Sequence, residues 1–348
     1  MRNLFCSALL LATTLTALDL NDRITRLEEK MQDVRTQTVY GNYGASTASA
    51  YPSMNTWGIY GTIEGLYMKF TEGGTDYAWT DTVAGGSPYV GKLKYLDYDW
   101  RFAFRVTAGY QFDCPDWDLW AEYMRFATSQ SNTTNLPAGG GLYSNVFNGG
   151  SISSLTKIRQ SVAFNTADLN LGRNYFLRRN VSMHPFFGLR GAWINQHQNT
   201  KIDSVSSVFY QMKQKNDYGG LGLRTGSSVR WHLSQGWSLF GSLSAALMWG
   251  QFDNSLKQIQ TSSGTTTTNI DLNTDTRRIL PNMMADAGIT WEHVFRRGRL
   301  GMTLGYEFDY WWRQNQTVHV DASTTYTYYR ISEDLALQGV KLNLGYDF

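Results

Sequence analysis

The last nine residues of the chain alternate strictly between apolar side chains and polar or small ones. On an extended strand Val340, Leu342, Leu344, Tyr346 and Phe348 share one face, with Lys, Asn, Gly and Asp between them. An exposed apolar face is unstable in water, but it fits a strand with lipid on one side and a wet lumen on the other. The chain end therefore predicts a transmembrane β-barrel.

The same period of two returns along the chain from residue 57 onward. Clear examples run from Phe102 to Phe112, from Ala167 to Leu171 and from Leu300 to Tyr310. We expect an all-β, antiparallel barrel of ten strands, or of twelve if a further hairpin lies within 72–99 or 128–157.

Two kinds of connection alternate between these strands. The short polar ones lie at 113–116, 178–184, 232–236 and 295–299, and the long ones at 72–99, 128–157, 200–212, 254–276 and 314–327. Outer-membrane barrels keep short turns in the periplasm and long loops outside, so we expect both chain ends on the periplasmic side.

The composition excludes two other classes of protein. No run beyond the N-terminus approaches the ~18 to 20 apolar residues of a membrane helix, which excludes a helical membrane protein. Charged residues make up 17% and aromatic residues 14%, with 33 Gly and 6 Pro, as is typical of a barrel. The net charge of +2 gives no support to nucleic-acid binding.

The N-terminus has the pattern of an export signal. Arg2 precedes an apolar core from Leu4 to Leu15, so we expect a signal peptide at 1–17. Cys114 is then the only cysteine of the exported protein, and it either remains a free thiol or bridges to a second copy.

A short helical segment is expected at 18–36, followed by a flexible linker at 37–55 and the barrel at 56–348. Its heptad seam consists of Leu20, Ile24, Leu27, Met31 and Val34. Two heptads are too short to be stable alone, so the helix packs on its own barrel, on the membrane surface or in an oligomer. We expect a homo-oligomer, with three copies by analogy with porins.

Seven segments resemble, in order along the chain, one known family. They are FRVTAGYQF (104–112), DLWAEYMRF (118–126), DLNLGRNYFL (168–177), HPFFGLRGAWINQ (184–196), WSLFGSLSAALMWGQF (237–252), YEFDYWWRQNQ (306–316) and LALQGVKLNLGYDF (335–348). The family is that of pore-forming outer membrane proteins typified by the Legionella major outer membrane protein and the MOMP-like proteins of chlamydia-related bacteria. The resemblance implies a porin-like channel in the outer membrane, surrounded by outer-membrane lipid and without catalytic residues.

The terminal strand also resembles the signal that the outer-membrane assembly machinery recognises. Tyr346 and Phe348 are the two aromatic residues that would carry this signal.

A conducting lumen needs fixed charges of both signs, because opposed charges bias ion passage. The charged residues expected on the inner face are Arg101, Arg105, Arg190, Arg224, Arg230, Arg313, Asp168, Asp286, Glu292, Glu307 and Asp309. The competing interpretation is that they pair with one another and fill a barrel of intermediate size.

Two other functions compete with the channel. A surface barrel or adhesin would act through Ser/Thr-rich loops, above all 261–268. An enzyme would need His beside Asp or Ser at the rim, where His197, His319 and Asp321 are candidates without a further partner at a recognisable spacing. We therefore expect no enzyme, and no metal or cofactor site.

Overall fold

A computed structural model describes residues 58–84, 90–112, 117–144, 152–178, 180–234, 236–295, 298–321 and 327–347. The expected signal peptide, helical seam and linker, and Cys114 and Phe348, lie outside these residues. Nearly all of the described chain is β-strand. Within it, no helix is long and apolar enough to cross a membrane.

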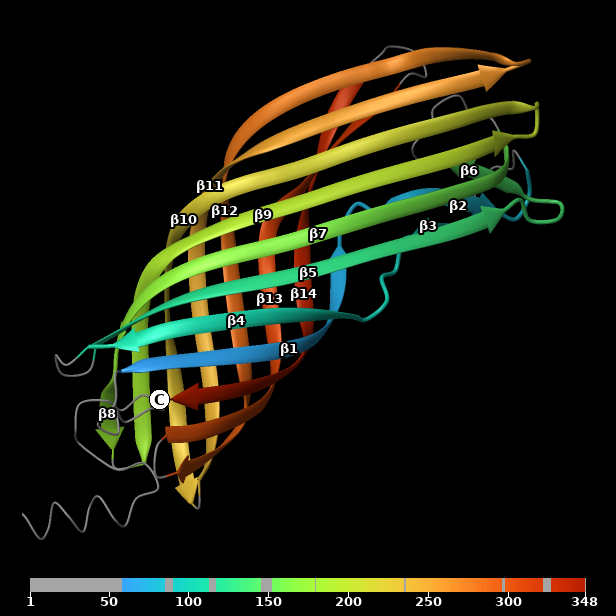
Figure 1. The fold of residues 1–348 in the computed structure, drawn as a ribbon. Helices are drawn as coiled ribbons and strands as arrows, with labels where there is room; N and C mark the ends of the chain where they lie inside the picture. Colours follow the sequence, from blue (N-terminus) through green and yellow to red (C-terminus); the bar gives the residue numbers. More distant parts are fainter. Residues whose placement is uncertain are drawn as a thin grey trace, which may run out of the picture.

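Ten antiparallel strands form a closed ring (Figure 1). Each strand pairs with its neighbours in the chain, and β1 closes the ring against β14, with Tyr60 opposite Asp347. The predicted ten-stranded barrel is confirmed. The ring consists of β1 (Ile59–Glu72), β4 (Arg101–Gln111), β5 (Trp117–Asn135), β7 (Ser153–Arg173), β9 (Val181–Ser204), β10 (Val208–Ser234), β11 (Trp237–Ser262), β12 (Thr265–Phe295), β13 (Gly298–Asp321) and β14 (Thr327–Asp347).

Four short strands lie outside the ring. β2 (Asp76–Asp81) pairs with β3 (Gly91–Tyr95) and with β6 (Gly141–Ser144) in a separate three-stranded sheet, and β8 (Tyr175–Arg178) pairs only with β9. A hairpin therefore does lie within 72–99, but it pairs with β6 and leaves the barrel at ten strands.

Several strands are far longer than a bilayer requires. β12 has 31 residues and β10 has 27, whereas a tilted membrane strand needs about 9 to 11. The prediction of long loops at 200–212 and 254–276 is wrong, because both stretches are strand except for short turns at 205–207 and 263–264. β11 and β12 are joined by a tight turn with Ser263 (φ 49°) and Gly264 (φ 80°) both left-handed, as in a type I′ hairpin. Thr-rich stretches favour strand, and polar side chains suit both faces of a wall beyond the membrane.

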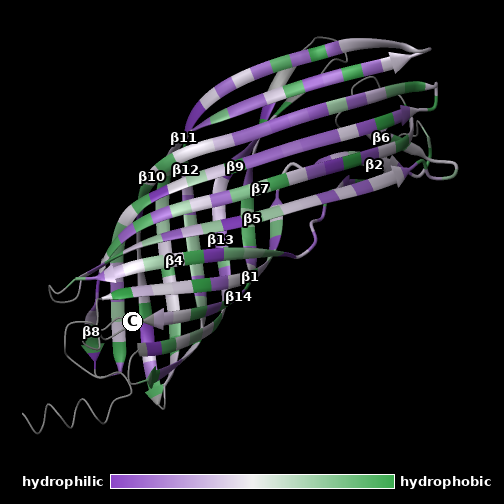
Figure 2. Cartoon of the chain, viewed as in Figure 1, coloured by the Kyte–Doolittle hydropathy of each residue, from purple (hydrophilic) through white to green (hydrophobic). Residues whose placement is uncertain are grey.

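The outer face carries an apolar band near the chain ends, visible as alternating colours in Figure 2. On β10 it runs from Trp231 to Leu221, and on β11 from Trp237 to Trp249. Aromatic residues at the two edges form the girdles typical of outer-membrane barrels. Tyr346 lies exposed on this face near the lower edge, at the C-terminal end of β14.

The interior is not polar throughout, contrary to the expectation of a wet lumen. A layer of buried aromatic rings spans the barrel, farther from the chain ends than the middle of the band. We call it the apolar layer, and use 'above' and 'below' for farther from and nearer to the chain ends. Within it, Trp311 packs edge-on against Phe164 with ring centroids 5.7 Å apart. Its members include Phe70, Phe126, Phe164, Tyr218, Phe252 and Trp311. Side chains from opposite walls of a narrow barrel meet at its axis and fill it.

Candidate functional site

Below the apolar layer, all ten barrel strands contribute to one buried network, which we call the charged cluster. Its outward neighbours Phe104, Leu223 and Tyr306 belong to the apolar band, so the cluster lies at membrane height. The members, in chain order, are Glu64, Arg105, Glu122, Asp168, Arg190, Arg224, Ser244, Asn282, Asp286, Glu307, Asp309 and Lys341.

Strand register places these side chains together. Glu64 is opposite Arg105 in the β1–β4 pair, Asp168 is opposite Arg190 in the β7–β9 pair, and Asp286 is opposite Glu307 in the β12–β13 pair. The two opposite-charge pairs stabilise their register, whereas Asp286 beside Glu307 requires a cation. Lys341 supplies it, pairing with Asp286 and lying 3.7 Å from Glu307.

Arg105 is the centre of one half of the cluster. Its Nη1 atom donates to Glu64 Oε2 at 2.7 Å, and its two terminal nitrogens donate to both carboxylate oxygens of Glu307 at 2.7 and 2.5 Å. Its Nε atom is 3.4 Å from Glu122 Oε1. One guanidinium thus connects strands β1, β4, β5 and β13.

Asp168 is the centre of the other half. It accepts two hydrogen bonds of 2.8 Å from Arg190 and one of 2.6 Å from Arg224. Arg190 also donates to Asn282 Oδ1 at 2.6 Å, and Asn282 donates to Asp309 at 2.5 Å. This half therefore continues across the lumen from β7 to β13.

The cluster contains six carboxyl groups and four cationic groups (Glu64, Glu122, Asp168, Asp286, Glu307 and Asp309 against Arg105, Arg190, Arg224 and Lys341). All are buried or nearly so, and charges removed from water require ionic and hydrogen-bond partners to remain stable. The arrangement gives the barrel a polar, acidic section at membrane height.

A second ionic group lies nearer the chain ends. Glu292 pairs with Arg230 and is 3.4 Å from Arg299, and all three come from strand ends close to the short turns. This group carries more cationic than anionic side chains.

The structure brings together most of the residues that the alternation placed on the inner face. Arg105, Arg190, Arg224, Asp168, Asp286, Glu307 and Asp309 join the charged cluster, and Arg230 and Glu292 join the lower group.

Two predicted inner-face residues do not join either ionic group. Arg101, the first residue of β4, is opposite the buried Met68 and so has the inner-face register, but it is exposed at the end of its strand. Arg313 is exposed because the β13–β14 register shifts between Trp311 and Asn315, and Arg313 takes a left-handed conformation there (φ 54°). A bulge of this kind changes which face the following residues occupy, so the alternation of the sequence no longer predicts the face of a residue at that point.

Sequence reasoning missed Glu64, Glu122 and Lys341 as members of the cluster. Each does alternate with outward apolar neighbours, Ile63, Tyr123 and Leu342 among them. On β1 the alternation of polar and apolar residues is not recognisable, because Leu66 and Met68 on the inner face are as apolar as the residues on the outer face.

Above the apolar layer the lumen becomes polar again, outside the girdles. Glu72 accepts hydrogen bonds from Gln160 at 2.9 Å and Gln196 at 2.5 Å. Burial raises the pKa of the Glu72 carboxyl to about 8, against an ordinary value of 4.5. Gln160, Gln196 and Asn216 also border a cavity of about 10 Å³, which is room for one water molecule.

One buried amide lies on each side of the apolar layer. Asn170, below it, and Asn254, above it, are at most 2% exposed, and neither side chain has a hydrogen-bond partner within the described protein. Buried amide groups without protein partners require water.

The residues considered for a catalytic site at the rim are only partly within the described residues. His197 lies on the outer face with Nε2 3.4 Å from Asp217, and the side chains of His319 and Asp321 fall outside the description. Across the described ranges, no three His, Cys, Asp or Glu side chains gather as metal ligands would.

Comparison with known proteins gives one family. The model for the Legionella pneumophila major outer membrane protein precursor matches residues 52–348. Among solved structures, the outer membrane protease OmpT from Escherichia coli is 9% identical with a TM-score of 0.45, and the match covers 86% of this chain and 100% of that one. A FadL homologue from Pseudomonas aeruginosa is 9% identical with a TM-score of 0.27, covering 83% and 89%. No curated protein matches.

Proposed function

The chain belongs to the Legionella major outer membrane protein family, and on that premise we propose that it is a porin-like channel for passive passage of ions and small solutes. It is a β-barrel protein of the bacterial outer membrane. The proposal concerns what the lumen does.

One observation carries this proposal, namely the charged cluster at membrane height. Buried ion pairs contribute no more stability than well-packed apolar residues of similar volume. A barrel selected only for stability therefore has no need of ten charged side chains in its interior. Such side chains do suit a section that hydrates and admits ions.

The path is narrow. The charged cluster and the apolar layer both fill the barrel, so conduction requires long side chains to move aside while water enters. We expect small unitary currents with frequent closures, not the steady large conductance of a wide porin. The acidic excess of the cluster predicts a preference for cations.

The decisive experiment is conductance of the purified, folded protein in a planar bilayer. Trp311→Ala removes the largest ring of the apolar layer and should enlarge the unitary conductance several-fold. Trp312→Ala is the matched control, because Trp312 is the next residue, is half-buried and stacks edge-on with Tyr310 on the opposite face. Equal conductance of the two variants would contradict a path through the lumen.

The filled interior favours one other function, that of a structural or adhesive surface barrel. In this case the binding surface would be the polar wall formed by the long strands β9 to β12, with the Thr-rich hairpin at 261–268. Absence of current from both the native protein and Trp311→Ala would favour this function over the channel.

A further inference from the structure

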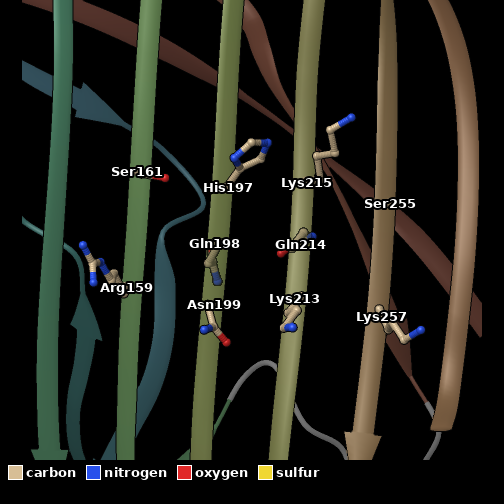
Figure 3. A pocket seen from close by; sticks show the side chains of 10 residues that line it. All are labelled: Arg159, Ser161, His197, Gln198, Asn199, Lys213, Gln214, Lys215, Ser255 and Lys257. Atoms are coloured by element: carbon tan, nitrogen blue, oxygen red, sulfur yellow. The ribbon is translucent and has the colours of Figure 1, made fainter.

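The outer wall just beyond the upper girdle carries a row of cationic side chains across four strands. Strand register aligns Arg159 of β7, Asn199 of β9, Lys213 of β10 and Lys257 of β11 side by side. Their neighbours in sequence, such as Gln160 and Met212, are buried, so this row faces outward. Together with Ser161, His197, Lys215 and Ser255 of the next row, it borders a hollow of about 410 Å³ (Figure 3).

The positive charge of this hollow is only partly neutralised. Lys215 is 2.9 Å from Asp217 and 3.1 Å from Asp253, and Lys257 is 3.2 Å from Asp271. For Arg159 and Lys213, by contrast, the described part of the chain offers no carboxylate at ion-pair distance.

Like charges also face each other here. Lys213 is directly opposite Lys257, and in the next row away from the membrane Lys157 is opposite Lys201. Such pairs destabilise a sheet unless an anion lies between them. Among the acidic side chains nearby, Asp217 and Asp253 lie on the membrane side of the row and already contact Lys215. Asp271 lies in the row, directly opposite Lys257, and contacts only this lysine, so Lys213 has no anion beside it among the described residues.

Directly below, the apolar band is interrupted by a trough. Gly191 and Gly219, which place no side chain on the outer wall, border a groove of about 470 Å³ that is also lined by Trp193, Leu221, Trp249, Gln251 and Arg277. A Cβ atom at Gly219 would meet only Trp193 Cδ1, at 3.9 Å, so the space over this residue is open. The tryptophan and leucine side chains of this lining suit contact with a hydrocarbon chain.

The two features are stacked in the order of a lipid molecule. His197 is four residues beyond Trp193 on β9, about 13 Å along the strand at ~3.3 Å per residue. A lipid with its acyl chain in the glycine groove therefore has its head group at the cationic hollow.

We propose that this face of the barrel binds one phosphorylated glycolipid of the outer leaflet. Arg159, Lys213 and Lys257 bind its phosphate groups, Ser161 and Asn199 bind sugar hydroxyls, and the glycine groove holds an acyl chain. The proposal goes beyond channel activity and is independent of it, because it concerns the outer wall and not the lumen.

The test uses the full chain folded in detergent, with diphosphoryl hexa-acyl lipid A as the probe and native mass spectrometry as the readout. We expect one lipid A per chain. Lys213→Gln with Lys257→Gln should weaken binding roughly 10- to 30-fold, from two lost phosphate contacts. The matched control is Lys92→Gln with Lys94→Gln, two lysines of β3 in the separate sheet, which should bind as the native chain does.

The groove is tested independently of the charges. Gly219→Leu places a side chain in the trough, where its Cβ atom would meet only Trp193 Cδ1, and should weaken lipid A binding several-fold. Gly65→Leu is its control, because Gly65 on β1 is also exposed with open space where a Cβ would be placed. Heat-modifiable mobility on gels confirms that each variant is folded.

Three results would overturn the proposal. One is equal lipid A binding by the Lys213/Lys257 double variant and the native chain. Another is unchanged lipid A binding by Gly219→Leu, which would mean that the groove holds no acyl chain and that the cationic hollow binds anions in general. The third is complete displacement of lipid A by millimolar inorganic phosphate, which would mean that free phosphate is the ligand.

Discussion

Arg105 and Glu307, 202 residues apart in the chain, form a two-pronged ion pair inside the barrel, with N–O distances of 2.7 and 2.5 Å. Their side chains are 4% and 0% exposed. The pair joins β4 to β13 across the two intervening strands β1 and β14, so it connects non-adjacent parts of the wall at membrane height.

Breaking this pair should destabilise the barrel. Arg105→Gln leaves Glu307 and Glu64 without their shared cation, and removal of one partner from a buried ion pair costs about 3 kcal/mol or more. Unfolding in detergent, followed by heat-modifiable mobility, measures the loss. The exposed Arg101→Gln on the same strand is the control, with an expected change within about 0.5 kcal/mol. Equal stability of the two variants would contradict the role of the pair.

Charge reversal in the cluster should alter ion selectivity. Arg105→Glu and Arg224→Glu each replace a cation with an anion in a confined lumen, so the reversal potential in a salt gradient should shift towards cation selectivity. The outward neighbours provide controls: Phe104→Leu and Leu223→Val should leave the reversal potential unchanged. A current that ignores both reversals would mean that ions pass elsewhere.

Glu72 should make stability depend on pH. Its pKa of about 8 in the folded protein exceeds its ordinary value of 4.5, so between these values the folded state holds a proton that the unfolded chain releases. Stability therefore falls as pH rises through this window, by at most about 1.4 kcal/mol per pH unit. Thermal unfolding of native protein and Glu72→Gln from pH 5 to 9 tests this.

The Glu72→Gln profile should be flatter than the native one across that window. Asp275→Asn, which alters an exposed carboxylate on β12, should keep the native slope. A native profile as flat as that of Glu72→Gln would show that the buried carboxyl does not titrate as expected.

The C-terminal aromatic residue should control assembly. Deleting Phe348 removes the end of the terminal strand pattern and should sharply lower the yield of folded protein in the outer membrane. Gly264 at the β11–β12 turn, far from the chain ends, is the comparison site, and Gly264→Asn should affect yield little because Asn also adopts left-handed backbone. Normal yield after deletion of Phe348 would contradict the prediction that this residue is part of the assembly signal.

The heptad seam at 20–34 should contribute to a homo-oligomer, proposed as a trimer. Covering its apolar stripe with further copies stabilises it by ~25 cal/mol per Å² of buried apolar surface. Native mass of the full protein beside a variant lacking 20–34 measures the contribution. A monomeric full-length protein would refute the proposal, as would an oligomer that is unchanged by the deletion.

The alternation of inward and outward residues predicted much of the charged cluster, because residues two apart on a strand share a face independently of the rest of the chain. Arg190 and Asp168 were recognisable in this way, and so were the ten strands and the membrane band. Arg313 was not, because a register shift depends on how β13 fits β14 and not on β13 alone.

The sequence alone determined the class of fold, the lipid-facing band and the location of the chain in the outer membrane, since each follows from the local alternation of apolar and polar residues. Only the tertiary structure decided that Arg105 meets Glu307, that Trp311 and Phe164 close the axis, and that Lys213 faces Lys257 above a glycine groove. These contacts depend on strand pairing and on the width of the closed ring, which bring together residues that no local pattern relates.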